Sequence, residues 1–227
     1  MKTHASTLVV CAAPAEDVTG FYDRLLGSAE YIVAVDDGAS VCLRADRIPD
    51  ILVGDFDSLD PATADWSAAH GVETLRHPSK KDVTDLDLAL EVLRARGLTD
   101  VCITAAWSGR LDHTFAALGS ACRYADLGIM LRDPGLAGWV LEASRFSRLA
   151  LGPAGSTVSL VAPLGPAVVS CEGMAYPLER HTLDVLSSRG ISNEIVDARA
   201  EIRVFDGTIC VLSSEVEGVA LAHALCW

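Results

Sequence analysis

The first 140 residues alternate between short, β-branched apolar runs and amphipathic segments, and this alternation constrains the fold more than any other feature of the chain. The expected strands are residues 8–12, 31–35, 51–53, 101–105 and 128–131. The expected helices are residues 18–26, 61–70, 86–96 and 111–125. Thr84 followed by Asp87 also predicts a capping box at the start of the third helix. Nearly continuous apolar strands separated by helices are typical of a parallel sheet that is covered on both faces.

After about residue 145, glycine and proline punctuate shorter runs that alternate between apolar and polar residues. The expected strands of this part are residues 157–161, 167–171, 202–205 and 208–212. Such a pattern is typical of an all-β unit. We therefore predict an α/β fold in which an N-terminal parallel-sheet domain, residues 1–145, precedes a smaller C-terminal β-sandwich, residues 146–227.

The charge balance limits the kinds of partner that the chain can bind. Its 227 residues contain 18 Lys and Arg against 31 Asp and Glu, which gives a net charge of −13. This balance argues against an extended nucleic-acid surface and against binding to an anionic membrane. No apolar run approaches the roughly 20 residues of a membrane span. The seven cysteines form no CxxC pair, which favours buried thiols in a reducing compartment, and we expect a cytoplasmic protein.

Carboxylates gather just beyond the expected parallel strands, where such sheets bind their ligands. Asp36 follows the second strand, Asp55 and Asp57 follow the third, and Asp85 lies at the start of a helix. Carboxylates brought into one crevice repel one another unless a cation is present, and the absence of a Cys/His ligand set favours Mg²⁺. Each feature taken alone also has an ordinary explanation as a turn, a loop or a helix terminus.

Several sequence elements follow one another in an order that is specific to one family. They are Asp-Gly-Ala at 37–39, PDILVGDFDSL at 49–59, KKDVTDLDLAL at 80–90, SGRLDH at 108–113, EGMAYPL at 172–178 and GISNE at 190–194. Taken together they resemble the thiamine pyrophosphokinase family, and the resemblance covers residues 33–194. GDFDS and GRLDH are the most specific of these elements.

The resemblance implies transfer of a pyrophosphoryl group from ATP to the hydroxyl of thiamine, with release of AMP. It implies that residues 1–145 form a catalytic domain that binds the nucleotide and Mg²⁺. Residues 146–227 would contribute to thiamine binding and to a homodimer. The absence of a GxxxxGK[ST] loop agrees with a kinase that is not of the P-loop type.

The resemblance also implies roles for individual residues. The expected ligands of Mg²⁺ are Asp55, Asp57 and Asp85. The expected catalytic residues are Asp55, Asp57, Asp85, Arg110 and Asp112. The expected contacts with the nucleotide or with thiamine come from Asp36, Lys81, Thr84, Arg110, His113, Ser192 and Asn193. An arginine suits the phosphates because its guanidinium can donate to two oxygens at once.

Three positions depart from the family pattern: Asp37 and Ser108 stand where the family has glycine, and Ala117 stands where it commonly has asparagine. These departures keep two alternatives open, namely a related Mg²⁺-dependent pyrophosphokinase acting on another heterocyclic alcohol such as a hydroxymethylpterin, and a non-catalytic homologue that binds thiamine or nucleotide. A glycosyltransferase of the DxD type ranks last, because it needs neither GRLDH nor Ser192-Asn193. Trp227 could stack on the substrate or pack between subunits.

Overall fold

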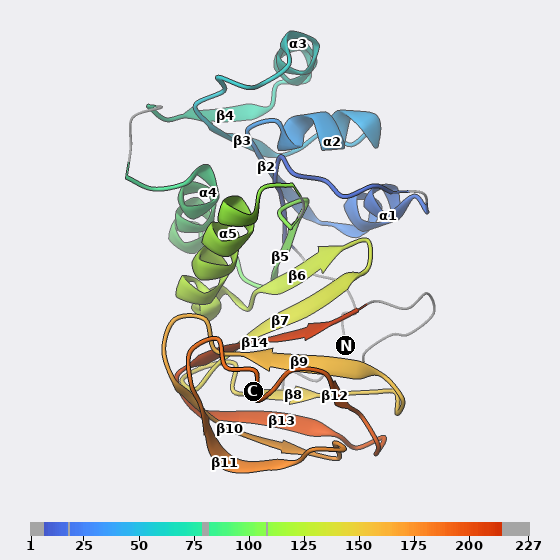
Figure 1. Ribbon diagram of the computed structural model, residues 1–227. Coiled ribbons are helices and arrows are strands. Elements are labelled where there is room, and N and C mark those ends of the chain that lie inside the picture. Colours follow the sequence, from blue (N-terminus) through green and yellow to red (C-terminus); the bar gives the residue numbers. More distant parts are fainter. Residues whose placement is uncertain (1–6, 18, 79–81, 108, 215–227) are drawn as a thin grey trace. The chain divides into compact units, whose positions relative to one another are not determined.

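The structure is a computed structural model that describes residues 7–17, 19–78, 82–107 and 109–214 (Figure 1). The chain forms two compact units. The first, the α/β unit, runs to Ser120 and takes back Arg132–Pro134, and the second, the β unit, contains Ala121–Leu131 and the chain from Gly135 onward. None of the helices in the described part of the chain has the length and apolarity that a membrane span requires.

The α/β unit is built on a parallel sheet with the strand order β5-β1-β2-β3-β4. Its strands are β1 (Thr7–Val10), β2 (Tyr31–Val35), β3 (Ile51–Gly54), β4 (Glu73–Arg76) and β5 (Val101–Thr104). Its helices are α1 (Phe21–Ser28), α2 (Gly38–Arg44), α3 (Pro61–Ala69), α4 (Asp85–Ala95) and α5 (Leu111–Arg123), the last of which crosses into the β unit. Every residue of β1, β3 and β5 is buried, as expected for strands that are covered on both faces.

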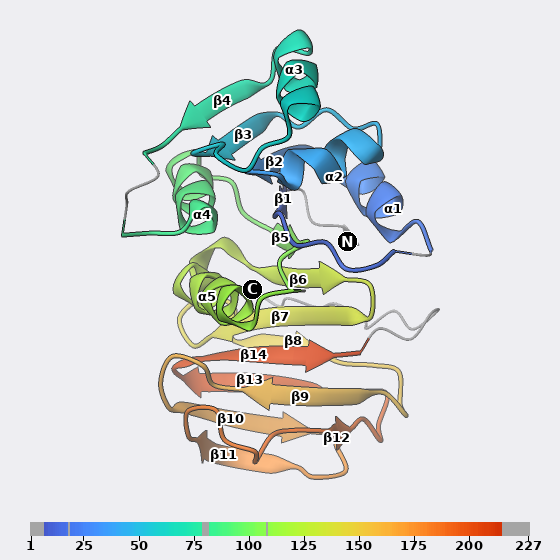
Figure 2. The same cartoon turned by 45° about the horizontal axis from the view of Figure 1, so that its top comes forward.

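The order of these strands fixes where a ligand can bind. The chain steps from β1 to β4 in one direction across the sheet and then returns through α4 to β5, on the other side of β1. Helices α2 and α4 both pack against β2, and they lie on opposite faces of the sheet (Figures 1 and 2). In such doubly wound sheets, ligands bind beyond the carboxyl ends of the strands. The segments that follow the parallel strands, including the one that leads from β4 into α4, are therefore the ones that can form a site.

The β unit contains two antiparallel sheets, with strand orders β12-β9-β14-β7 and β11-β10-β13-β8. Its elements are η1 (Ala125–Leu127), β7 (Leu136–Glu142), β8 (Arg148–Ala150), β9 (Thr157–Val161), β10 (Ala167–Glu172), β11 (Leu178–Leu183), β12 (Asn193–Glu194), β13 (Glu201–Asp206) and β14 (Thr208–Ser213). β6 (Met130–Asp133) begins in the β unit and ends in the α/β unit. Alternate residues of β9 and β10 are buried, so each strand presents one face to the core.

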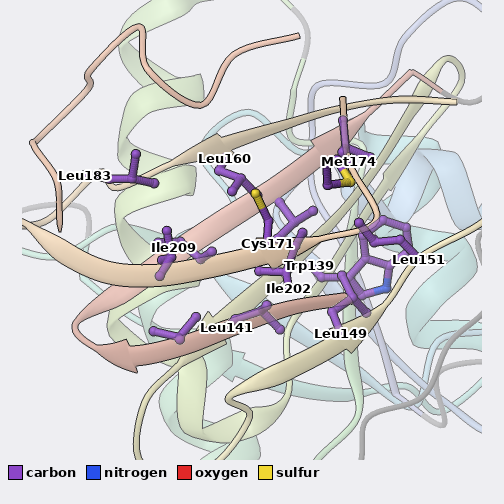
Figure 3. Close-up of a cluster of buried hydrophobic side chains, with 14 of the residues drawn as sticks. Trp139, Leu141, Leu149, Leu151, Leu160, Cys171, Met174, Leu183, Ile202 and Ile209 are labelled. Carbon is purple, nitrogen blue, oxygen red and sulfur yellow. The ribbon is translucent and has the colours of Figure 1, made fainter. Parts of the chain in front are cut away.

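The core of the β unit lies between its two sheets. Trp139 on β7, Leu160 on β9, Cys171 on β10 and Ile202 on β13 belong to one cluster of buried side chains (Figure 3). Trp139 is the bulkiest of them and is 2% exposed. Aligned sheets that interdigitate their inner side chains in this way form a β-sandwich. The predicted fold class, an α/β domain followed by a smaller β-sandwich, is therefore confirmed.

The structure divides the chain earlier than the expected boundary after residue 145. β7 lies before that boundary, yet it pairs with β14 from Ala137 to Glu142, and its side chains belong to the sandwich core. Cross-strand pairing with the last strand of the chain thus assigns this segment to the β unit.

Candidate active site

Three aspartates come together beyond the carboxyl ends of β2 and β3 and at the start of α4. Asp36 follows β2, Asp55 follows β3, and Asp85 is the first residue of α4. Burial, the charges of Asp85 and Asp55 and a hydrogen bond with Asp85 together raise the pKa of Asp36 from 3.8 to about 6, against the lowering effect of the hydrogen bond from the Phe56 amide. We refer to Asp36, Asp55 and Asp85 as the aspartate cluster.

The backbone around the aspartate cluster is shaped to admit the Asp36 side chain. Asp36 and Phe56 both have positive φ angles, 46° and 64°, and the Phe56 amide donates to Asp36 Oδ1 at 3.4 Å. A Cβ on Gly54 would lie 1.8 Å from Asp36 Oδ1, so only glycine fits between the two loops. Strained backbone conformations that the surrounding structure maintains are typical of functional sites.

The chemistry of the aspartate cluster suits a hard divalent cation. Among the described residues, no group of three His, Cys, Asp or Glu side chains is already arranged as a metal site. The cluster nevertheless supplies only carboxylate oxygens, which Mg²⁺ prefers, and their mutual repulsion is the kind that a cation relieves. Asp57, the third expected ligand, has an exposed side chain, and its backbone amide donates to Asp55 Oδ1 at 3.0 Å.

The N-terminus of α4 is fixed by the capping box that the sequence predicted. Thr84 Oγ1 accepts from the Asp87 amide at 3.2 Å and donates to Asp87 Oδ2 at 2.8 Å, while the Thr84 amide donates back to Asp87 Oδ2 at 3.2 Å. This cap engages the Thr84 hydroxyl and places Asp85 in the first helical turn, where the helix dipole favours a negative charge. Lys81 lies outside the described residues.

A second charged group lies at the start of α5. Arg110 donates to Asp112 through two nitrogens, Nε to Oδ1 at 3.1 Å and Nη2 to Oδ2 at 2.6 Å. The two side chains are 71% and 65% exposed, and the pairing raises the pKa of Arg110 and lowers that of Asp112. His113 is exposed beside them, and Ala117, one turn further, is buried. The structure thus joins Arg110 to Asp112 and exposes both to solvent.

Asp37, which replaces a glycine of the family pattern, precedes α2 and pairs with a side chain of that helix. The Ser40 hydroxyl donates to Asp37 Oδ1 and also lies 3.1 Å from Thr63 Oγ1. The position that requires a glycine is the next one, because a Cβ on Gly38 would lie 2.0 Å from the carbonyl oxygen of Val10. This chain therefore has glycine at position 38, where the backbone of β1 lies too close to leave room for a side chain.

The β unit contains a cavity of about 450 Å³ lined by residues 175–178, residues 188–191 and Asn193. We refer to it as the loop cavity. Asn193 is 4% exposed, and it binds the backbone of Tyr176 on both sides: its Oδ1 accepts from the Tyr176 amide at 2.9 Å, and its Nδ2 donates to the Tyr176 carbonyl at 2.7 Å. Ser192 has a positive φ of 55° and an exposed side chain. Asn193 thus holds the wall of the cavity in place.

Sequence reasoning did not single out Tyr176. Its ring is 71% exposed and it lines the loop cavity, while its backbone is bound by Asn193. The available signal was its place in EGMAYPL, in a connection outside the expected strands, because binding residues are disproportionately found on loops. Trp227 lies outside the described residues.

Comparison with known proteins agrees with this two-part arrangement. The model of the thiamin pyrophosphokinase catalytic domain matches residues 22–131, and the model of the thiamin pyrophosphokinase vitamin B1 binding domain matches residues 148–209. Thiamine pyrophosphokinase 2 of Arabidopsis thaliana is 30% identical over 89 residues, which are 37% of this chain. That match spans 33% of the plant protein's length.

Solved structures show that the fold is shared over nearly the whole chain. Thiamine pyrophosphokinase from Bacillus subtilis superposes with a TM-score of 0.74 at 23% identity, covering 92% of this chain and 98% of that one. Thiamin pyrophosphokinase from Candida albicans gives a TM-score of 0.75 at 16% identity, covering 93% of this chain and 90% of that one. Because the models of both domains match in order and together span well over half of its residues, this chain belongs to the thiamin pyrophosphokinase family.

Proposed function

We propose that this protein is a thiamine pyrophosphokinase, which transfers the pyrophosphoryl group of ATP to the hydroxyl of thiamine and releases AMP and thiamine diphosphate. The observation that carries the proposal is the aspartate cluster, whose carboxylates repel one another where a nucleotide and its metal would bind. The aspartate cluster lies within the part of the chain that matches the catalytic-domain model. The loop cavity lies within the part that matches the vitamin B1 binding domain.

Asp55, Asp57 and Asp85 would hold Mg²⁺ through carboxylate oxygens, and Asp36 would stabilise it through its nearby charge. When bound, the ion supplies positive charge that neutralises the phosphates of ATP. The chain itself contributes the arrangement of these carboxylates, which the strained loop after β3 and the cap of α4 keep in place. Fixing them before ATP binds avoids reorganisation during the reaction.

The proposal assigns the remaining nucleotide contacts to five further residues, namely Lys81, Thr84, Arg110, Asp112 and His113. The exposed guanidinium of Arg110 already donates two parallel hydrogen bonds to Asp112, and the same fork fits two oxygens of a phosphate. We infer that Asp112 holds Arg110 extended until ATP binds. In-line displacement at the β-phosphorus then depends mainly on positioning and on neutralisation of charge.

The β unit would bind thiamine at the loop cavity. Tyr176 lines the cavity and is exposed, and Asn193 lines it and is buried, while the exposed Ser192 precedes Asn193 in the chain. An aromatic face suits the cationic thiazolium ring of thiamine, and the net charge of −13 favours the approach of a cation. We also propose that the protein acts as a homodimer. The six described cysteines are free thiols, which favours a reducing compartment, the cytoplasm.

A single-turnover assay tests this proposal. The protein is mixed with ATP, Mg²⁺ and thiamine, and the products are identified by mass; we expect AMP and thiamine diphosphate in equal amounts. AMP formed only with another heterocyclic alcohol, such as a hydroxymethylpterin, would keep the reaction and replace the substrate. Binding of thiamine and nucleotide without any AMP would instead show a non-catalytic homologue and overturn the proposal.

A further inference from the structure

A buried carboxylate outside the aspartate cluster organises the ends of two strands. Asp133, at the end of β6, is 2% exposed. Its Oδ1 accepts three hydrogen bonds: from the Tyr22 hydroxyl at 2.8 Å, from Thr104 Oγ1 at 3.1 Å and from the Ala105 amide at 2.9 Å. All four residues belong to the α/β unit. One oxygen atom thus joins α1, the end of β5 and the end of β6.

The same network reaches the segment that follows β1. The Tyr22 hydroxyl, which donates to Asp133, also accepts from the Ala15 amide at 2.8 Å. The Ala13 amide donates to the Ala105 carbonyl at 2.7 Å. The carboxyl ends of β1 and β5 are therefore tied together at the point where the strand order of the sheet reverses, which is the usual position of a ligand crevice in such folds.

Asp133 stabilises a backbone conformation that its neighbours would not otherwise adopt. Ala105 has a φ of 54°, in the left-handed region that residues with a side chain rarely occupy. The Asp133 carboxylate accepts from the Ala105 amide, and the Trp107 amide also acts on this carboxylate by lowering its pKa, although burial dominates and raises it. Arg110 follows Trp107 by three positions.

The three hydrogen bonds to Asp133 use only one of its two carboxylate oxygens. Asp133 Oδ2 is buried and has no hydrogen-bond partner among the described residues. Burying an incompletely paired carboxylate destabilises a fold, and an apolar side chain of similar size usually costs less. The carboxylate does, however, supply an acceptor for the Ala105 amide, five positions before Arg110, which an apolar side chain could not supply.

We propose that Asp133 is a positioning residue for the nucleotide site, which sets the 105–107 turn and thereby the place of Arg110. This inference rests on the proposed function, because it gives Arg110 the role of binding the phosphates of ATP. Asp133 itself touches no substrate; it acts through the Ala105 amide. The turn follows the carboxyl end of β5, and a displacement of about 1 Å at a reaction site can cost on the order of 100-fold in rate.

A double-mutant cycle with Arg110 separates this role from general stability. We expect Asp133→Ala to weaken binding of the ATP analogue α,β-methylene-ATP, with Mg²⁺, by about 10- to 100-fold, and to leave thiamine binding within about twofold. In the Arg110→Ala background the same substitution should add almost nothing, because the group that it positions is already absent. Additive losses in the double mutant, or equal losses for thiamine and nucleotide, would overturn the proposal.

Two further variants keep the test decisive if Asp133→Ala does not fold. Tyr22→Phe removes one of the three hydrogen bonds to Asp133 Oδ1, and it should weaken analogue binding by about two- to fivefold, again only when Arg110 is present. Leu26→Val, a buried position on the same helix without a polar contact, is the matched control for lost packing. Equal effects of Tyr22→Phe and Leu26→Val on analogue binding would contradict the positioning role.

Analogue binding also separates this inference from the proposed function. If the wild-type protein produces no AMP, the proposed function fails, while the analogue still reports whether Asp133 acts through Arg110. If the wild-type protein turns over but the cycle is additive, the positioning role fails alone. If Arg110→Ala binds the analogue as tightly as wild type, there is nothing to position and the inference is wrong.

Discussion

In the proposed reaction, the aspartate cluster of the α/β unit serves the nucleotide and its metal, and the Ser192–Asn193 element of the β unit serves thiamine. The two regions differ in whether the interactions of their polar side chains are satisfied in the free protein. Burial and the like charges of Asp85 and Asp55 raise the pKa of Asp36. The amide of Asn193 is buried, and its hydrogen bonds to the Tyr176 backbone are satisfied. We therefore expect a bound cation to stabilise the first region, whereas the hydrogen bonds of the second need no ligand.

This difference shows that residues of family motifs do not share one physical role. Like charges placed together lower the stability of the free protein, and a bound cation removes that cost. A buried amide that spans a peptide unit stabilises the loop around a cavity, and its loss leaves backbone groups unpaired. Substitutions should therefore affect activity most in the first region and folding most in the second.

The largest effect is expected for Asp85→Asn. Removing this carboxylate should lower kcat by on the order of 100-fold or more, because charge on the phosphates would be less well neutralised. Thermal unfolding without Mg²⁺ should occur at an unchanged or higher temperature, because a like charge beside Asp36 is lost. Initial rates at saturating ATP, with differential scanning calorimetry, test both parts.

The same change at Asp57 decides whether that exposed side chain belongs with the aspartate cluster. Asp57→Asn should lose most of the turnover and keep its fold. A wild-type rate in this variant would remove Asp57 from the proposed set of metal ligands.

A smaller effect, on stability rather than on kcat, is expected for Asn193→Ala. The Tyr176 amide and carbonyl would lose their partners, which should lower the free energy of unfolding by about 2 to 4 kcal/mol. The thiamine KM should rise because the wall of the loop cavity moves, while the ATP KM stays unchanged. Urea unfolding and steady-state kinetics provide the two measurements, and an unchanged unfolding midpoint would show that the amide contributes little.

A smaller effect is expected in the pH dependence of the stability of the metal-free protein, which tests the aspartate cluster without a substitution. The pKa of Asp36 in the folded protein, about 6, lies above its ordinary value of 3.8. Folding therefore favours the protonated form, so the stability that this group contributes is full below pH about 4 and is lost as the pH rises through about 6. Mg²⁺ should raise the unfolding temperature more at pH 7.5 than at pH 5.

Asp36→Asn is the control for that titration, because asparagine keeps the shape without the charge. The variant should lose the pH-dependent part of the Mg²⁺ effect. An Asp36 carboxyl carbon that titrates near 3.8 by NMR in the metal-free protein would contradict the crowding of the cluster.

Much of the α/β sheet could be predicted because burial on both faces leaves a clear trace in the sequence. β2 was predicted at its observed bounds, Tyr31–Val35, since its apolar run stops abruptly at Asp36. β4 was missed because it is an edge strand whose four residues, Glu73–Arg76, are largely exposed and polar. α2 was missed because its seven residues follow directly on the Asp37-Gly38 pair, which predicts only a turn.

The sequence shows directly only those contacts of the candidate site that are local in the chain. The Thr84–Asp87 cap spans three residues, so its pattern is visible in the sequence. The network of Asp133 joins residues that are 111, 29 and 28 positions apart. The contact of Asn193 with Tyr176 spans 17 positions. Neither contact has a periodicity or a motif of its own, and both depend on tertiary folding.

The smallest expected effect belongs to Ser192, and it sharpens the comparison within the β unit. The Ser192 side chain is exposed beside the buried Asn193, and its backbone amide donates to Ser159 Oγ at 3.0 Å. Ser192→Ala keeps this amide and removes only the hydroxyl. The unfolding midpoint should therefore stay where it is, while the thiamine KM rises by about three- to tenfold, the value of one hydrogen bond to a ligand.

The two neighbouring residues should therefore differ in whether their substitution changes stability as well as the thiamine KM. Asn193→Ala should lower stability and raise the thiamine KM together, because it moves the cavity wall, whereas Ser192→Ala should change the KM alone. An increase in the ATP KM for Ser192→Ala would place the hydroxyl on the nucleotide instead. Unchanged kinetics in both variants would move thiamine away from the loop cavity, and the Tyr176 ring would then be only an exposed aromatic of the surface.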